Sequence, residues 1–150
     1  MTNEVKSLEE LRAVAEGFLH EVAQIPSEKR ATVVGLSGDL GAGKTAFVKC
    51  IADVLGIKET ITSPTFILEK VYTIPRGSLL GACFTKLIHI DAYRLHSGSE
   101  MRALDWDTIT RDPANLIFIE WPEQVTEVMP KETISLSFEY VNESTRKITF

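Results

Sequence analysis

Residues Gly38 to Thr45 read GDLGAGKT, and their types and spacing suit phosphate chemistry. The segment matches G-x-x-x-x-G-K-[ST], the pattern of a phosphate-binding loop. Gly41 and Gly43 permit backbone angles that let successive N–H groups converge on phosphate oxygens. Lys44 can reach the β- and γ-phosphates of a nucleotide, and the Thr45 hydroxyl is suited to Mg²⁺. The pattern therefore predicts a loop that binds a nucleoside diphosphate or triphosphate.

Two carboxylates further along the chain could complete such a site. Asp91 follows the apolar segment KLIHI, and Glu120 follows LIFI. A buried strand rarely ends on a carboxylate that lacks a partner, because burying an unpaired charge is costly. A phosphate loop needs an acid at the end of a neighbouring strand to hold the metal or its water. We therefore expect both carboxylates to face the loop.

The segments on either side of the loop have the structure that it requires. Ala31 to Leu36 is a short run rich in β-branched residues, which predicts a buried strand. A helix is expected from Lys44 to the stop signal at Gly56, with its inner face formed by Phe47, Val48, Ile51, Val54 and Leu55. The alternative is a glycine-rich turn whose Lys44 and Thr45 simply face water. The strand and helix that flank the loop favour the phosphate site.

The remaining elements predict further layers around this unit. Ser7 and Glu10 form a capping-box pattern at the start of a helix whose apolar side chains recur at helical spacing up to Pro26, namely Leu8, Leu11, Ala15, Phe18 and Val22. Phe66–Ile74 and Leu79–Asp91 look extended and are joined by a turn at PRGS, which predicts a hairpin.

Three later segments complete the predicted fold. Ser97–Asp107 is expected to form a short helix, Leu116–Glu120 a buried strand, and Thr133–Phe150 two strands around VNES. The sequence contains no repeat or interdomain linker, so residues 1–150 are expected to form a single domain. The fold class is α/β: a mixed sheet of the P-loop NTPase type, flanked by helices and carrying antiparallel hairpins.

Composition narrows the classes of function. The 150 residues are 44% hydrophobic and 25% charged, with a net charge of -5. The negative net charge argues against a protein that binds nucleic acid by itself. The N-terminal residues lack the apolar segment of a signal peptide, and the longest apolar runs are too short to span a membrane. Cys50 and Cys83 have no metal-site or disulfide spacing and are expected to be reduced, buried thiols. These features favour a cytoplasmic protein.

Four motifs in order make the chain similar to a known family. They are GDLGAGKT at 38–45, SPTF at 63–66, HIDAYRL at 89–95 and IEWPE at 119–123. The chain resembles the TsaE (YjeE) family along nearly its full length. This resemblance implies a small bacterial ATPase, dependent on ATP and Mg²⁺, that supports threonylcarbamoyl modification of tRNA adenosine (t6A). It also implies that the ATPase acts on the partner proteins TsaB and TsaD. It would contact tRNA only through the complex of these partners.

The resemblance assigns roles residue by residue. It implies metal ligands at Thr45 and Glu120 and a strand-end aspartate at Asp91, which we expect to position water, although the two carboxylate roles could be exchanged. Thr65 lies in a segment that could rearrange and sense the γ-phosphate. The residues expected to act in catalysis are Lys44, Asp91, Glu120 and Thr65. Those expected to bind nucleotide are Gly38, Asp39, Leu40, Gly41, Ala42, Gly43, Lys44, Thr45, Asp91 and Trp121.

Other interpretations remain open at the level of sequence. A GTPase would need an N-K-x-D stretch, which the chain lacks. A small-molecule kinase shares the loop but needs an acceptor pocket and an arginine-bearing lid. A non-hydrolysing module would use nucleotide only to fix a binding conformation. His89 could orient Asp91 or serve packing, and Trp121 could simply cap the sheet. The stretch between Tyr72 and Asp91 is longer than is usual for the family.

Overall fold

The computed structural model of the chain describes residues 1–25, 27–61 and 68–150. Its helices are α1 (Leu8–Ala23), α2 (Lys44–Val54) and α3 (Trp106–Arg111), with the 3-10 helices η2 (Gly98–Leu104) and η3 (Pro122–Val128). Its strands are β1 (Thr2–Val5), β2 (Thr32–Ser37), β3 (Glu69–Thr73), β4 (Lys86–Asp91), β5 (Asn115–Glu120), β6 (Ile134–Asn142) and β7 (Thr145–Thr149). No helix in these ranges is both long and apolar enough to cross a bilayer.

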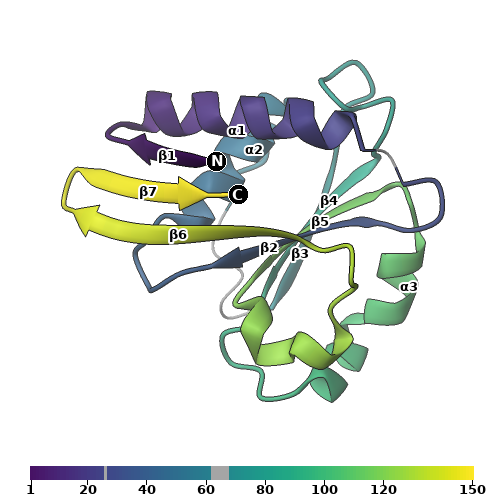
Figure 1. Cartoon of the computed structure of the whole chain (residues 1–150). Helices are drawn as coiled ribbons and strands as arrows, with labels where there is room; N and C mark the ends of the chain where they lie inside the picture. Colours follow the sequence, from purple (N-terminus) through teal and green to yellow (C-terminus); the bar gives the residue numbers. More distant parts are fainter. Residues whose placement is uncertain (26, 62–67) are drawn as a thin grey trace.

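The strands of the described residues form one mixed sheet in the order β1-β7-β6-β2-β5-β4-β3. Strands β6, β2, β5 and β4 run parallel, whereas β3 pairs with β4, β7 with β6 and β1 with β7 antiparallel. Helices α1 and α2 cover one face, and α3 lies with the 3-10 helices on the other (Figure 1). This is the predicted mixed α/β fold, with its antiparallel pairs at the two edges of the sheet.

The register of the parallel strands places three strand ends side by side. Leu36 of β2 pairs with Glu120 of β5, and Glu120 pairs with Asp91 of β4. Because parallel strands share their carboxyl edge, the loop after β2 and both carboxylates emerge at the same place. Side chains alternate along a strand, so His89 and Asp91 share a face of β4. Leu87, on that same face, packs into the core beneath α1 and α2.

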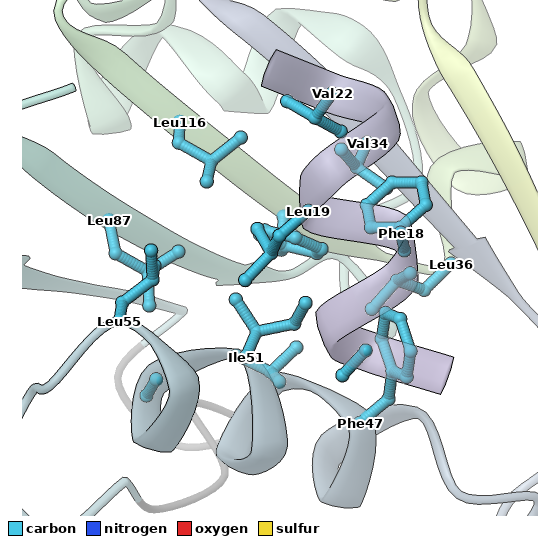
Figure 2. Close-up of a cluster of buried hydrophobic side chains, with 14 of the residues drawn as sticks. Phe18, Leu19, Val22, Val34, Leu36, Phe47, Ile51, Leu55, Leu87 and Leu116 are labelled. Carbon is cyan, nitrogen blue, oxygen red and sulfur yellow. The ribbon is translucent and has the colours of Figure 1, made fainter. Parts of the chain in front are cut away.

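The core between the sheet and helices α1 and α2 is built around phenylalanine. Phe47 of α2 is fully buried, and its ring centroid lies 5.9 Å from that of Phe18 of α1 and 5.4 Å from that of Phe138 of β6. Figure 2 shows these helices meeting the sheet through side chains from both, including Leu19, Ile51 and Leu116. Edge-on aromatic contacts add to the free energy gained by burying the rings. The core fixes where α2 begins and therefore where the phosphate loop ends.

The start of α1 is capped much as the sequence predicts. Ser7 Oγ accepts a hydrogen bond from Glu10 N at 3.1 Å, while the Glu10 carboxylate accepts one from Lys6 N rather than from Ser7 N. Leu8, which is expected on the inner face, is 72% exposed instead. It lies in the first turn, ahead of the point where α1 contacts the sheet through Leu11 and later residues.

The segment between β3 and β4 differs from the prediction. The sequence predicts strand over Leu79–Asp91, but β4 begins at Lys86, and residues 78–84 form consecutive turns, with Phe84 N donating to Leu80 O at 2.9 Å. These turns bury the apolar side chains of Leu80 and Phe84 against the core, which is why the segment resembles a strand in sequence. Cys83, expected to be buried, is exposed on the turns.

Two further elements were not predicted correctly. The single helix expected over Ser97–Asp107 is divided into η2 and α3, because Asp105 takes a left-handed conformation (φ 57°) between them. Because of that turn, Met101 and Trp106 both pack into one apolar cluster, on the face of the sheet that α3 and the 3-10 helices cover. Strand β1 was missed altogether, since its short polar sequence buries a single side chain, Val5, and its pairing with β7 depends on backbone groups.

We expect Phe47→Ala to lower the free energy of unfolding by about 3–5 kcal/mol, because it removes a fully buried ring and leaves a cavity among the aromatic residues. Val71→Ala is the control, since Val71 is 49% exposed on β3 and should change stability by less than about 0.5 kcal/mol. Urea unfolding followed by circular dichroism measures both. Similar losses in the two variants would contradict this account of the core.

Candidate functional site

The loop of residues 38–43 holds a conformation that depends on glycine. A Cβ on Gly38 would lie 2.3 Å from the backbone oxygen of Phe138, so β6 leaves no room for a side chain there. Gly43 has a φ of 106° and directly precedes α2. Without a side chain at this position to cap the helix, the first amides of α2 and the positive end of its dipole can serve an anion.

Lys44 folds back over the loop that precedes it. Its side chain is buried, and Nζ donates to the carbonyl oxygens of Gly38 and of Asp39, the latter at 3.0 Å. Nζ also lies 4.4 Å from the centre of the Trp121 ring. Burial lowers the pKa of Lys44, and the carboxylates of Glu120, Glu123 and Asp91 oppose that shift. A phosphate group would offer this ammonium a stronger partner than neutral carbonyls do.

Thr45, Glu120 and His89 form a continuous chain of hydrogen bonds. Thr45 Oγ1 donates to the Glu120 carboxylate, lying 3.0 Å from Oε2 and 3.2 Å from Oε1. On the other side of that carboxylate, Nε2 of His89 is 2.7 Å from Oε2. The sequence suggested His89 as a partner of Asp91, whereas the structure puts its ring against Glu120. A hydroxyl and a carboxylate oxygen this close together are ligands that suit Mg²⁺.

Asp91 and Trp121 complete the wall opposite the loop. Asp91 is 4% exposed, and its Oδ1 accepts a hydrogen bond from Tyr93 N at 2.9 Å. The Trp121 ring lies between Lys44 and Tyr93, with its centroid 5.1 Å from that of Tyr93. Trp121 takes a left-handed backbone conformation (φ 61°), and its N–H donates to Leu36 O at 3.1 Å. A tryptophan in this conformation is strained, and such strain is often found at functional sites.

A cavity of about 560 Å³ joins these groups. Its floor is the loop from Leu40 to Thr45, and its wall contains Asp91, Glu120 and Trp121. The structure places these predicted residues around one cavity, whereas Gly38 and Asp39 of the loop are not among its lining residues. Thr65, the remaining residue expected to act in catalysis, lies outside the described residues, as does the whole SPTF motif. The volume falls in the range of sites that hold small molecules and cofactors.

Sequence reasoning missed the part of the cavity formed by the two ends of the chain. It is lined by Val5 to Leu8 at the junction of β1 and α1, and by Glu143, Ser144 and Arg146 at the β6–β7 turn. Arg146 Nε donates to Gly41 O at 3.1 Å, and its guanidinium carbon lies 4.4 Å from the Tyr140 ring centre. The alternation of apolar and polar residues over Thr133–Phe150 predicts a hairpin. Nothing in that pattern indicates that Arg146 would contact the phosphate loop.

Comparison with known proteins agrees with this geometry. The family model of threonylcarbamoyl adenosine biosynthesis protein TsaE matches residues 5–148. The chain belongs to the TsaE family. It is 38% identical over 121 residues to the tRNA threonylcarbamoyladenosine biosynthesis protein TsaE of Treponema pallidum, covering 81% of this chain and 82% of that relative. The protein of that name from Streptomyces coelicolor is 37% identical over 106 residues, or 69% of this chain and 66% of the relative.

A solved structure shares the fold. The crystal structure of Bacillus subtilis YdiB superposes with a TM-score of 0.68 at 26% identity, covering 99% of this chain and 82% of that one. The match extends over almost the whole chain and therefore includes the edge strands as well as the central parallel sheet. The segment between β3 and β4 lies within the matched length.

The position of Trp121 predicts an optical signal. The chain has two tryptophans, so Trp106→Phe leaves Trp121 as the tryptophan emitter. Nucleotide at the loop should draw Lys44 Nζ away from the ring, and we expect the fluorescence emission of Trp121 to change saturably as ADP is added. In Trp121→Phe the change should vanish. Saturable ADP binding by calorimetry, with no change in Trp121 emission, would contradict the arrangement.

Proposed function

We propose that this chain is a Mg²⁺-dependent ATPase that supports t6A formation in tRNA together with TsaB and TsaD. The observation that carries the proposal is a single cavity at the carboxyl edge of the sheet. The phosphate-loop residues, including Lys44 and Thr45, line it together with Asp91 and Glu120. Each part of phosphoryl-transfer catalysis has a matching group there.

Phosphate binding is assigned to the loop and Lys44. The loop amides and the start of α2 would hold the β- and γ-phosphate oxygens, and Lys44 would exchange the carbonyls of Gly38 and Asp39 for phosphate. The lysine is already buried and held close to this position, so little side-chain freedom is lost when nucleotide binds. The positive charge would then offset the charge on the phosphates as the bond to the γ-phosphate breaks.

Metal binding is assigned to Thr45 and Glu120. Their oxygens are already 3.0 Å apart, and both are hard ligands of the kind that Mg²⁺ takes alongside nucleotide phosphates. Mg²⁺ held by these two side chains would supply positive charge that offsets the charge developing on the phosphate oxygens. The contact between Thr45 and Glu120 supports giving the metal role to Glu120 rather than to Asp91.

Water positioning is assigned to Asp91. It ends β4 beside Glu120, and its carboxylate is held by the N–H of Tyr93. A carboxylate fixed beside the metal ligands can accept a proton from a water molecule and orient the lone pair of that water toward the γ-phosphorus. Asp91 is nearly buried, so few solvent molecules compete for that place.

The nucleoside would occupy the part of the cavity formed by the β1–α1 junction and the β6–β7 turn. Leu8 lines this part and Leu40 lines the loop floor; both are exposed and offer apolar surface to a purine ring. ATP is preferred to GTP because the sequence lacks the N-K-x-D stretch of guanine-specific proteins. A small-molecule kinase and a non-hydrolysing nucleotide-gated module remain the alternative functions. Release of phosphate into water, without a phosphorylated metabolite, would exclude both.

The link to t6A comes from family membership. The TsaE relatives carry tRNA threonylcarbamoyladenosine biosynthesis in their names. The net charge of -5 and the lack of a basic run support tRNA being held by the partners and not by this chain. We also propose that residues 1–150 act as one domain in the cytoplasm. Hydrolysis would then drive or reset the TsaB–TsaD complex.

The two carboxylates should respond differently to loss of charge. Glu120→Gln should raise the Mg²⁺ concentration needed for half-maximal ATP hydrolysis. Asp91→Asn should slow hydrolysis by about 100-fold or more while ATP still binds, because a proton-accepting group is lost from the transition state. Phosphate-release assays with Mg²⁺ titrations measure both. Lys44→Ala is the inactive reference, and the reverse pattern in the two carboxylate variants would exchange their roles.

Partner proteins should accelerate the reaction. The purified chain should hydrolyse ATP slowly and bind tRNA negligibly at physiological salt, and hydrolysis should rise when TsaB and TsaD are added together. Thr65→Ala should bind ATP normally but respond less to the partners. Steady-state ATPase assays with each partner alone, both partners, and tRNA test this. Full activity in isolation, or tight tRNA binding by the chain alone, would contradict the proposal.

A further inference from the structure

His89 is a fully buried histidine on the strand next to one edge of the sheet. It lies on β4 between Lys70 of β3 and Phe118 of β5, and none of its surface is exposed. It is not among the residues that line the cavity, so it would not touch nucleotide directly. An imidazole in such a place is costly to bury unless its nitrogens are bonded. The contact of His89 with Glu120, at 2.7 Å, is therefore the main interaction that offsets the cost of burying the imidazole.

The two ring nitrogens of His89 have different surroundings. Nε2 faces Glu120 Oε2, and the tautomer with its hydrogen on Nε2 would donate it to the carboxylate. Nδ1 is buried and has no hydrogen-bond partner among the described residues. An unpaired buried nitrogen destabilises the fold, and an apolar side chain would fill this position without that cost. Packing alone does not explain a histidine here.

The two oxygens of the Glu120 carboxylate have different numbers of close polar neighbours. Oε2 lies 2.7 Å from His89 Nε2 and 3.0 Å from Thr45 Oγ1, whereas Oε1 lies 3.2 Å from Thr45 Oγ1. The histidine thus holds one oxygen from the interior of the protein. The carboxylate lines the cavity together with Thr45, where the metal would lie.

We propose that His89 is a positioning residue for Mg²⁺ binding, acting through Glu120. A hydrogen on Nε2 would hold the Glu120 carboxylate from the interior of the protein, in the orientation that lets it reach the metal position beside Thr45. Once the Thr45 oxygen serves as a ligand, His89 remains the donor that keeps the carboxylate in place. This inference rests on the metal role proposed above for Glu120. Donors behind a metal ligand commonly fix its orientation and raise metal affinity.

A matched pair of amides can test the geometry of this contact. In His89→Gln the amide nitrogen follows Cα by the same number of bonds as Nε2 and can reach Glu120. In His89→Asn the amide stops near the position of Nδ1 and cannot. Mg²⁺ would be titrated at fixed ADP, with binding followed by calorimetry and Trp121 fluorescence. We expect His89→Asn to weaken Mg²⁺ binding by about 10–100-fold and His89→Gln to restore most of it.

Metal-free measurements and a control separate this role from packing. ADP binding in EDTA should be the same in both variants and in the wild type. Leu87→Ala removes a fully buried apolar side chain from the same face of β4, and it should lower the melting temperature without changing Mg²⁺ affinity. If His89→Asn does not remain folded, His89→Leu replaces it as the variant without the donor. Wild-type Mg²⁺ affinity in a folded variant lacking the donor would overturn the proposal.

Glu120→Gln distinguishes failure of this inference from failure of the metal assignment. If Glu120→Gln leaves Mg²⁺ affinity unchanged, the proposed metal site itself is wrong. If Glu120→Gln weakens Mg²⁺ binding but His89→Asn does not, only the role of His89 is wrong. The double variant should bind Mg²⁺ no more weakly than Glu120→Gln alone, because His89 acts through that carboxylate. Additive losses in the double variant would contradict the coupling.

Discussion

The in-register parallel pairing of β2, β5 and β4 is the constraint on which the site depends. It puts Leu36, Glu120 and Asp91 in one row, so a glycine loop and two carboxylates leave the sheet together. A slip of one residue between β4 and β5 would turn Asp91 to the opposite face and separate it from the loop. The apolar cores on both faces hold this register, because a slip would also exchange buried and exposed side chains.

The site concentrates charge that the fold must compensate internally. Lys44, Asp91 and Glu120 are each 4% exposed, and each would be costly to bury alone. The ammonium lies near both carboxylates, and the loop carbonyls accept from Lys44. Thr45 donates to Glu120, and Nε2 of His89 lies 2.7 Å from the same carboxylate. These contacts hold the groups in position before any ligand arrives. Preorganised charge of this kind needs little rearrangement during reaction.

The central unit could be predicted from sequence because local signals and tertiary structure agree there. The strand before the loop, the helix after it and the acids at two strand ends each carry a short-range pattern with one physical meaning. Prediction failed where that pattern was ambiguous or absent. Leu80 and Phe84 belong to an apolar segment that suits either a strand or buried turns. Strand β1 is so short and polar that its sequence does not predict a strand paired with β7. The contact of Arg146 with Gly41 depends on the sheet order, which no local pattern reveals.

The left-handed backbone at Trp121 sets conformational strain against the contacts that its ring makes. Strain of this kind is worth about 1–3 kcal/mol, and glycine would relieve it. The same change would remove the ring that lies between Lys44 and Tyr93. The ring also packs against the apolar cluster on the α3 face of the sheet, so glycine would lose that packing as well. A smaller residue at 121 would therefore relax the backbone while loosening both the wall of the cavity and the core behind it.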